Sequence, residues 1–298
     1  MKHLATQVTL CAFFFLALLI AVPLALSPKA EGEDFSLPLY DEDDQYFAIL
    51  LRAALEAADG DHRLSTSKIP VAQSRVLRSL LDHREGINVL YTGHSTEREN
   101  LMRQIDIPLS RGLLGYRVFV IRPQSQHLFQ GIETLEGLTQ RITVGSGTSW
   151  PDTTILRAAG FNVKTGSVEN LWQMLARNRF IAFPRGMNEV HAELKRYAET
   201  KLKEAVATEN TVMIYYPYDH FFYVAPEDET RANIIEQGLK RIYENGEFMR
   251  IFNSDPAISK SLALAAKYRR KVISLPNPLN SDRINKIPAK YWHSFEAP

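Results

Sequence analysis

Cysteine is almost absent from this sequence. The only cysteine among the 298 residues is Cys11, which lies in an apolar stretch near the N-terminus. The remainder of the chain therefore has no disulfide, no thiol nucleophile and no thiolate metal site. Leu10 stands before Cys11 where a lipid-attachment signal needs a small residue, so a lipid anchor is not expected. A chain of this length buries enough apolar surface to fold without disulfides.

The sequence also lacks an excess of charge of either sign. It has 35 Lys and Arg against 34 Asp and Glu, a formal net charge of +1. Proteins that bind nucleic acid usually carry a marked positive excess, so no nucleic-acid partner is expected. The histidines show no metal-ligand spacing, and there is no GxSxG elbow, no P-loop ending and no evident pair of catalytic acids. We therefore expect no metal, no cofactor and no enzymatic activity.

One long hydrophobic run is present, and it lies at the N-terminus. Lys2 and His3 precede an apolar stretch from Val8 to Leu26. A short basic start followed by such a stretch is typical of a secretory signal, which we expect to occupy residues 1–30. The competing interpretation is an uncleaved anchor, because the run is nearly long enough to span a bilayer. Both interpretations place the rest of the chain outside the cytoplasm, in the periplasm.

Beyond residue 30, segments with strand-like and helix-like patterns alternate. This alternation predicts an α/β fold in which helices cover largely parallel sheets. The predicted strands are 35–40, 86–91, 116–122, 141–144, 161–163, 180–183, 211–216 and 221–224, and the predicted helices are 41–58, 72–82, 132–138, 151–159, 168–177 and 189–207.

The order of these elements predicts two lobes. The chain builds one lobe from residues 31–122, leaves it to build a second from 123–217, and returns to the first with 218–298. Each lobe would be a mixed sheet flanked by helices. The two crossing strands would form a hinge, with a cleft between the lobes.

A loop rich in hydroxyl groups follows the strand at 86–91. It contains Thr92, Ser95, Thr96 and Arg98. Ligands of open α/β sheets bind at the carboxyl ends of strands, and the planar guanidinium of Arg98 suits a carboxylate or a phosphate. The alternative is a surface Arg98 paired with a neighbouring glutamate, and the spacing does not decide between the two.

Small residues form a turn between a predicted strand and the helix at 151–159. Gly147, Thr148 and Ser149 lie in this turn, and Trp150 ends it. Free backbone N–H groups at a helix start make a site for anions. The alternative is a plain tight turn in which Thr148 or Ser149 caps the helix.

Further candidates follow later strands. Arg185 and Glu189 could meet a zwitterionic or acidic solute, or could pair with each other. The aromatic run at 215–223 could stack on a ligand or pack in the hinge. Tyr40, at the end of the first predicted strand, completes the predicted ligand-binding set.

Together, residues 34–255 resemble the type 2 periplasmic solute-binding proteins, in particular the amino-acid-binding family of ABC importers. In that family a T-x-x-R loop of lobe one binds the solute carboxylate, and Ser95-Thr-Glu-Arg98 is similar, with Ser in place of the first Thr. A Gly-Thr-Thr turn of lobe two also contacts this carboxylate, and Gly147-Thr-Ser149 resembles it. The resemblance implies a type 2 fold that closes on a small solute.

One departure concerns the solute's ammonium group. The family places an Asp after the corresponding strand, whereas this chain has Gly186 there, flanked by Arg185 and Glu189. The change favours a more anionic solute. The expected function is binding of a small polar or anionic, amino-acid-like solute by a monomer, for delivery to an inner-membrane permease. The alternatives are a sensory or signalling accessory on the same fold and a small lyase or dehydratase that uses Glu189 as its acid or base.

Overall fold

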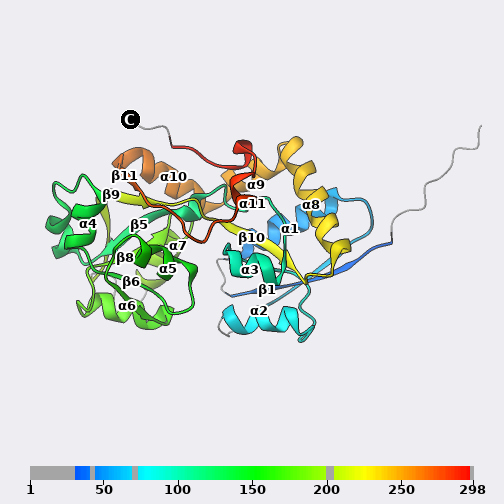
Figure 1. Cartoon of the computed structure of the whole chain (residues 1–298). Helices are drawn as coiled ribbons and strands as arrows, with labels where there is room; N and C mark the ends of the chain where they lie inside the picture. Colours follow the sequence, from blue (N-terminus) through cyan, green and yellow to red (C-terminus); the bar gives the residue numbers. More distant parts are fainter. Residues whose placement is uncertain (1–30, 41–43, 69–72, 199–204, 296–298) are drawn as a thin grey trace, which may run out of the picture.

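The structure is a computed structural model that describes residues 31–40, 44–68, 73–198 and 205–295. The predicted signal segment lies outside the described residues, as do the first three residues of the helix expected from residue 41. Figure 1 shows two lobes side by side, each with its own sheet and helices. No helix among the described residues is long and apolar enough to cross a membrane.

Lobe one contains two small sheets that are joined edge to edge. In the first, β1 (Asp34–Leu39) pairs in parallel with β2 (Arg63–Lys68). In the second, β3 (Leu90–Gly93) and β4 (Arg103–Gln104) lie antiparallel on either side of β10 (His220–Val224). The carbonyl of Ser36 accepts a hydrogen bond from the N–H of Val89, 3.4 Å away, and this bond connects the two sheets.

The helices of lobe one bury one apolar face each. Gly238 allows the two longest of them to pack closely, because a Cβ there would lie 1.9 Å from the carbonyl oxygen of Ala54. These two are α1 and α8, and the helices of the lobe are α1 (Gln45–Ala57), α2 (Gln73–Leu81), α3 (Thr96–Leu101), α8 (Glu229–Glu244) and α9 (Glu247–Ser254).

Lobe two is built on a six-stranded mixed sheet in the order β11-β9-β5-β8-β6-β7. The strand β5 runs antiparallel to both of its neighbours, whereas the other pairs are parallel. These strands are β5 (Tyr116–Ile121), β6 (Val144–Gly147), β7 (Val163–Gly166), β8 (Ala182–Gly186), β9 (Ala207–Tyr215) and β11 (Lys271–Ser274).

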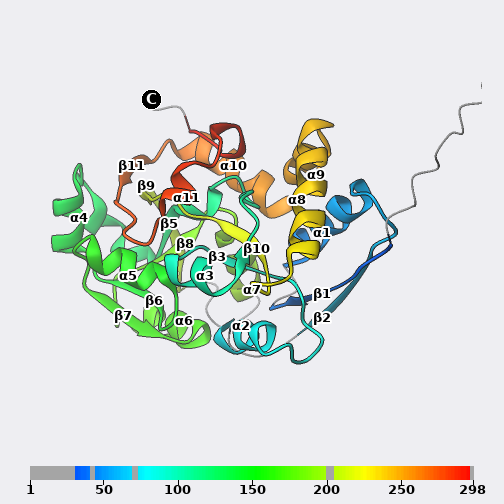
Figure 2. The same ribbon diagram turned by 45° about the vertical axis from the view of Figure 1, so that its right-hand side comes forward.

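Side chains of β5 alternate between two hydrophobic cores. Val118 and Val120 pack in one, and Phe119 and Ile121 pack in the other. The sheet is therefore buried on both faces, by the helices α4 (Leu135–Arg141), α5 (Pro151–Ala158), α6 (Val168–Ala176), α7 (Val190–Ala198) and α10 (Pro256–Tyr268). Figure 2 shows β11 beside β9 at the edge of this sheet. The short helices η2 (Leu113–Gly115), η3 (Pro123–Phe129), α11 (Asp282–Asn285) and η4 (Ala289–Tyr291) connect the larger elements.

The α/β class predicted from the sequence is confirmed, and each predicted element overlaps an observed one. Several boundaries differ, and β2, α3, β4, α10 and β11 were not predicted. Residues 145–147 were expected in a turn and instead belong to β6, where aromatic rings pack against both glycines. A Cβ at Gly145 would lie 2.3 Å from the ring of Phe180, and one at Gly147 would lie 2.4 Å from that of Trp150. The helix expected to reach residue 207 is α7, and β9 already begins at Ala207.

The predicted boundary between the lobes also differs from the strand pairing. Residues 116–122 were expected in lobe one, but β5 lies between β8 and β9 in the sheet of lobe two. The C-terminal residues 218–298 were likewise expected in lobe one, yet β11 pairs with β9. Both strands are placed by pairing with distant segments, which the local pattern does not show.

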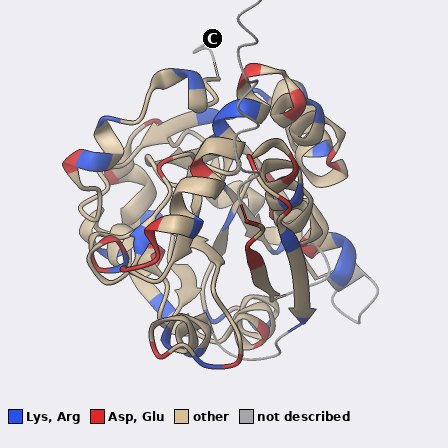
Figure 3. Cartoon of the chain, turned by 90° about the vertical axis from the view of Figure 1, so that its right-hand side faces the viewer, with Lys and Arg blue, Asp and Glu red and all other residues tan. Residues whose placement is uncertain are grey.

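Figure 3 shows basic and acidic residues interspersed over the elements in that view, in keeping with the balanced composition.

Candidate functional site

A cleft of about 860 Å³ lies between the two lobes. Residues of lobe one, lobe two and the hinge line it. From the predicted ligand-binding set, the cleft is lined by Tyr40, Arg98, Gly147, Thr148, Ser149, Trp150, Arg185 and Glu189.

Arg98 forms part of the lobe-one wall of this cleft. It lies in the first turn of α3, and Ser95 caps that helix by accepting the N–H of Arg98 at 3.2 Å. The guanidinium donates to Thr92 Oγ1 at 2.6 Å, to Gly93 O at 2.7 Å and to Gln73 Oε1 at 2.8 Å. All three acceptors are neutral, and Arg98 is only 8% exposed. Among the described residues its positive charge has no carboxylate partner.

Three predicted residues of this loop do not line the cleft. Thr92 is fully buried and holds the guanidinium of Arg98 in place. Ser95 is the helix cap. The hydroxyl of Thr96 donates to the carbonyl of Leu279, 2.8 Å away, so it faces the C-terminal segment.

Hydrogen bonds from the side chain of Thr153 hold the small-residue turn of lobe two in place. The hydroxyl of Thr153 contacts the oxygens of Ser146 at 2.8 Å and Gly147 at 2.7 Å. The N–H of Thr148 donates to Gly166 O at 3.2 Å, whereas the N–H of Ser149 has no acceptor among the described residues. This N–H lies just before α5, where the helix dipole favours an anion.

A buried cluster of charges forms the rest of the lobe-two wall. Arg117 contacts Asp152 at 2.5 Å and Glu189 at 3.6 Å. Arg185 contacts Glu189 at 3.0 Å and Glu193 at 2.6 Å, and its guanidinium lies 4.7 Å from the Trp150 ring centroid. Three carboxylates therefore face the guanidinium groups of Arg117 and Arg185, and Arg196 lines the cleft beside them.

The protonation states of the cluster follow from this pairing. Burial alone raises the pKa of Glu189, but the guanidinium groups of Arg185 and Arg117 hold it below the usual value of a glutamate. The pKa of each arginine is raised, because the neighbouring carboxylates outweigh the effect of burial. All three groups are therefore charged at neutral pH.

Aromatic rings make the floor of the cleft on the side of lobe one. Phe47 stacks on Tyr91 with their centroids 4.1 Å apart, and His220 meets Phe47 edge-on at 5.1 Å. Burial lowers the pKa of His220 to about 4, so its ring is neutral at pH 7. Its Nδ1 and the hydroxyl of Tyr40 are buried without a hydrogen-bond partner among the described residues. Both residues line the cleft.

Sequence reasoning missed Arg117, Asp152 and His220. A signal for Arg117 was present, because it is a charged residue inside an otherwise apolar strand. Asp152 follows Pro151 in the predicted anion-binding turn, and His220 lies in the aromatic run of the hinge. No group of three or more potential ligands for a metal ion occurs in the part of the chain that the structure describes.

Comparison with known proteins supports the fold by structure and not by sequence. No family model matches the chain, and no curated protein does. An ancestral arginine-binding protein bound to arginine has 14% identity and a TM-score of 0.53, over 74% of this chain and 96% of the other. A binding component of an ABC transporter from Wolinella succinogenes, complexed with lysine, has 13% identity and a TM-score of 0.53, over 75% and 94%.

A sensor domain gives a match that extends over more of this chain. It is a histidine kinase sensor domain with similarity to periplasmic binding proteins, with 16% identity and a TM-score of 0.53, and the match covers 83% of this chain and 96% of that domain. These likenesses show the two-lobed fold of the type 2 periplasmic binding proteins, and they confirm the fold that the resemblance implied.

Proposed function

From this two-lobed fold, we propose that the chain binds a small amino-acid-like solute in the cleft between its lobes. The observation that carries the proposal is the position of Arg98. A buried guanidinium with only neutral partners lines one wall, opposite a cluster of paired carboxylates and guanidinium groups on lobe two. An isolated buried charge is costly, so such a group is suited to a carboxylate ligand.

The contacts suggest how such a solute would lie. Its carboxylate would meet Arg98 and the N–H of Ser149, and its ammonium group would meet Glu189 or Asp152. The orphaned Nδ1 of His220 and hydroxyl of Tyr40 would bind further polar atoms. The solved proteins with the same fold include ones bound to arginine and to lysine, which fits a solute of this class.

The sequence favoured a more anionic solute, and the proposed solute is instead an amino acid, a zwitterion. Arg185 does not offer a free positive charge, because Glu193 contacts its guanidinium at 2.6 and 2.7 Å. Glu189 keeps one carboxylate at the cleft although Gly186 replaces the family's Asp. A zwitterion therefore fits better than a dianion. Binding of this kind requires no turnover, and we assign no catalytic role to Glu189.

Delivery to an inner-membrane permease and a periplasmic location are part of the same proposal. A second candidate is a sensory role, in which a membrane partner detects the closed form. The observation that favours it is the sensor domain whose match covers more of this chain than the two binding proteins do. The two roles share the solute site and differ in the partner.

The test is thermal melting of the full chain with a panel of amino acids, dicarboxylates and sulfonated or phosphorylated solutes. A solute at one hundred times its Kd stabilises the folded state by about 2.7 kcal/mol, which shifts the melting temperature visibly. We expect an amino acid to give such a shift and Arg98→Ala to abolish it. Arg103→Ala is the matched control, because Arg103 lies in the same lobe and pairs outside the cleft with Glu229. A shift that survives Arg98→Ala contradicts the proposed binding mode.

A further inference from the structure

The C-terminal segment, residues 256–295, is anchored on lobe two before it returns to lobe one. It follows α9, which packs on α1 and α8 in lobe one. Its first helix, α10, packs on α9 of lobe one and on α7 of lobe two, and the hydroxyl of Ser261 donates to the carbonyl of Met187. The strand β11 then pairs in parallel with β9, with Val272 opposite Met213. The first half of the segment thus belongs structurally to lobe two.

The chain next runs beside the hinge. The N–H of Leu275 donates to Tyr215 O at 2.7 Å, and the side chain of Asn277 donates to Pro217 O at 2.8 Å. Leu279 contacts both lobes. Its side chain packs against the lobe-two core that contains Leu275, while its carbonyl accepts the N–H of Thr96 at 3.2 Å and the Thr96 hydroxyl at 2.8 Å.

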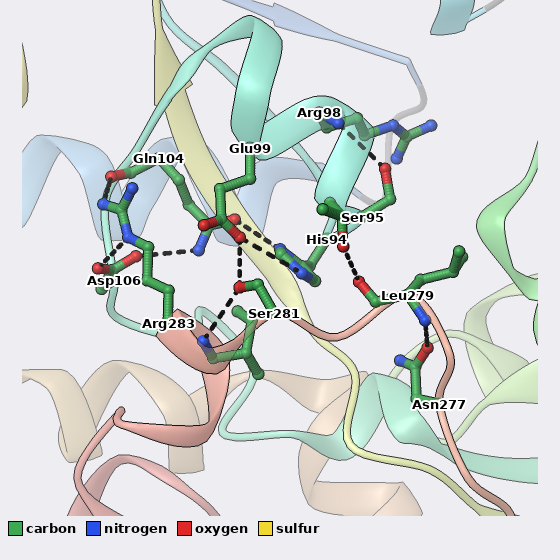
Figure 4. A network of polar contacts seen from close by, with 12 residues as sticks. His94, Ser95, Arg98, Glu99, Gln104, Asp106, Asn277, Leu279, Ser281 and Arg283 are labelled. Carbon is green, nitrogen blue, oxygen red and sulfur yellow. Dashed lines mark hydrogen bonds and ion pairs between the residues drawn. The ribbon is translucent and has the colours of Figure 1, made fainter.

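The second half of the segment is anchored on lobe one. Ser281 Oγ donates to Glu99 at 2.6 Å, and Arg283 forms an ion pair with Asp106 at 2.5 Å and donates to Gln104 O at 2.8 Å. Figure 4 shows this network on α3, with Glu99 directed toward Ser281 and Arg98 directed away from it. An aromatic contact continues the attachment, because the ring of Tyr291 meets that of Tyr243 on α8 edge-on, with their centroids 4.6 Å apart.

We propose that residues 256–295 form a strap that restrains the hinge. Two chain crossings join the lobes, between β4 and β5 and between β9 and β10, and the strap adds a crossing into lobe two and another back. The return crossing is short. At about 3.3–3.6 Å per residue step, the four steps from Leu275 to Leu279 can span at most roughly 14 Å. An opening of the cleft that separates Leu275 and Leu279 by more than this span requires one of the anchors to detach.

The strap also touches the solute site itself. Thr96 and Glu99, its contacts on lobe one, belong to the six-residue helix that carries Arg98. Asp255, which caps α10, and Ala257 and Ile258 in its first turn line the cleft. The angle between the lobes and the position of the solute-binding arginine are therefore coupled through one segment. The restraint rests on the fold and on these contacts, and it holds for any solute.

The experiment measures the distance between the lobes without solute. The full chain carries Cys11→Ser together with Arg78→Cys on α2 and Gln173→Cys on α6, two exposed positions on opposite lobes. Spin labels at these cysteines report the distribution of distances by pulsed electron resonance. A short glycine-serine insertion between Pro276 and Asn277 lengthens the strap and keeps all of its contacts. We expect a longer mean distance and a broader distribution.

The matched control is the same insertion between Gln130 and Gly131, an exposed loop within lobe two, which should leave the distribution unchanged. A second variant, Ser281→Ala with Arg283→Ala, weakens the lobe-one anchor without an insertion and should shift the distances in the same direction. Its control is Arg241→Ala, which breaks an exposed ion pair with Asp59 inside lobe one. An unchanged distribution in the folded insertion variant and in the Ser281/Arg283 variant overturns the strap. A failed solute screen leaves this result untouched, because no solute is present.

Discussion

The carboxylate of Glu189 occupies the space into which a side chain at Gly186 would project. A Cβ added at Gly186 would lie 2.9 Å from Glu189 Oε2, and the N–H of Gly186 donates to this same oxygen at 3.1 Å. The related amino-acid-binding family carries an Asp at this position. The loss of that side chain and the presence of Glu189 are therefore two parts of one arrangement, in which a carboxylate reaches the cleft from three residues further along.

The first prediction concerns Gly186→Ala. The added methyl would also lie 2.8 Å from Leu114 and from Asn188, so the neighbouring side chains must move. We expect the free energy of unfolding to fall by about 1–3 kcal/mol, as for other overpacked sites. Solute affinity should fall as well, because Glu189 is displaced. Urea denaturation and calorimetric titration measure the two effects.

The control is Gly166→Ala, also at the end of a lobe-two strand that lines the cleft. Its Cβ would lie at least 3.6 Å from any neighbour, which is an ordinary contact. If both alanine variants bind and unfold alike, the close approach of Glu189 to Gly186 has no consequence.

The second prediction concerns Thr92→Val, which removes a buried hydroxyl and almost no volume. Thr92 Oγ1 accepts from the guanidinium of Arg98 at 2.6 Å, so the valine leaves the arginine less firmly held. A hydrogen bond to a charged group contributes about 1.5–3 kcal/mol. Solute affinity should therefore drop roughly tenfold or more, as measured by calorimetric titration. Ser65→Ala, which removes a hydrogen bond to Phe35 O elsewhere in lobe one, should leave the affinity unchanged.

The third prediction concerns the buried ion pair between Arg117 and Asp152. Asp152→Leu leaves the guanidinium of Arg117 with only one carboxylate partner, the more distant Glu189, and the loss of one partner of a buried pair costs about 3–5 kcal/mol. Replacing both partners, with Arg117→Met and Asp152→Leu, should cost clearly less than the two single changes added together. Urea denaturation of the four proteins in the cycle measures this coupling. Additive costs would show that the pair does not act as a unit.

The fourth prediction concerns pH and His220. Burial lowers the pKa of His220 from 6.5 to about 4. Between these values the unfolded chain binds a proton at His220 that the folded protein does not. Stability from this group is therefore complete above pH 6.5 and is lost as the pH falls toward 4.

His220→Gln keeps a polar side chain and removes this titration. We expect the variant to lose less stability than the parent between pH 6.5 and pH 4, by an amount of about 3 kcal/mol. Thermal melting across this range measures the difference. The matched control is His127→Gln, at an exposed position on η3. Parallel pH profiles for the parent and His220→Gln would contradict the burial of this imidazole.

Local patterns were sufficient to predict most of the helices and strands. The apolar face of α1, with Ala48, Leu51, Ala54 and Leu55, is readable from the sequence because helical spacing places these residues on one side. Arg98 was identified because several hydroxyl groups and one arginine follow a predicted strand within a short loop. The choice between a solute contact and a pair with Glu97 or Glu99 was open, and the structure shows neither glutamate at the guanidinium.

The charged wall of lobe two was only partly predictable. Arg185 and Glu189 were named together because they are four residues apart, and they lie at 3.0 Å from each other. The pairing of Arg117 with Asp152 joins residues 35 positions apart, and no periodicity indicates it. It arises because β5 lies beside β8 in the sheet, with α5 packed nearby.

The sequence by itself determined the α/β class, the order of elements and the loop that carries Arg98. These features depend on residues close together in the chain, whose spacing and turn chemistry set local structure. Only the tertiary structure decided that β5 and β11 join the sheet of lobe two, that Glu189 fills the space at Gly186, and that Leu279 contacts both lobes. Each of these depends on which distant segments share buried surface, because strand pairing and close packing select their partners in space rather than along the chain.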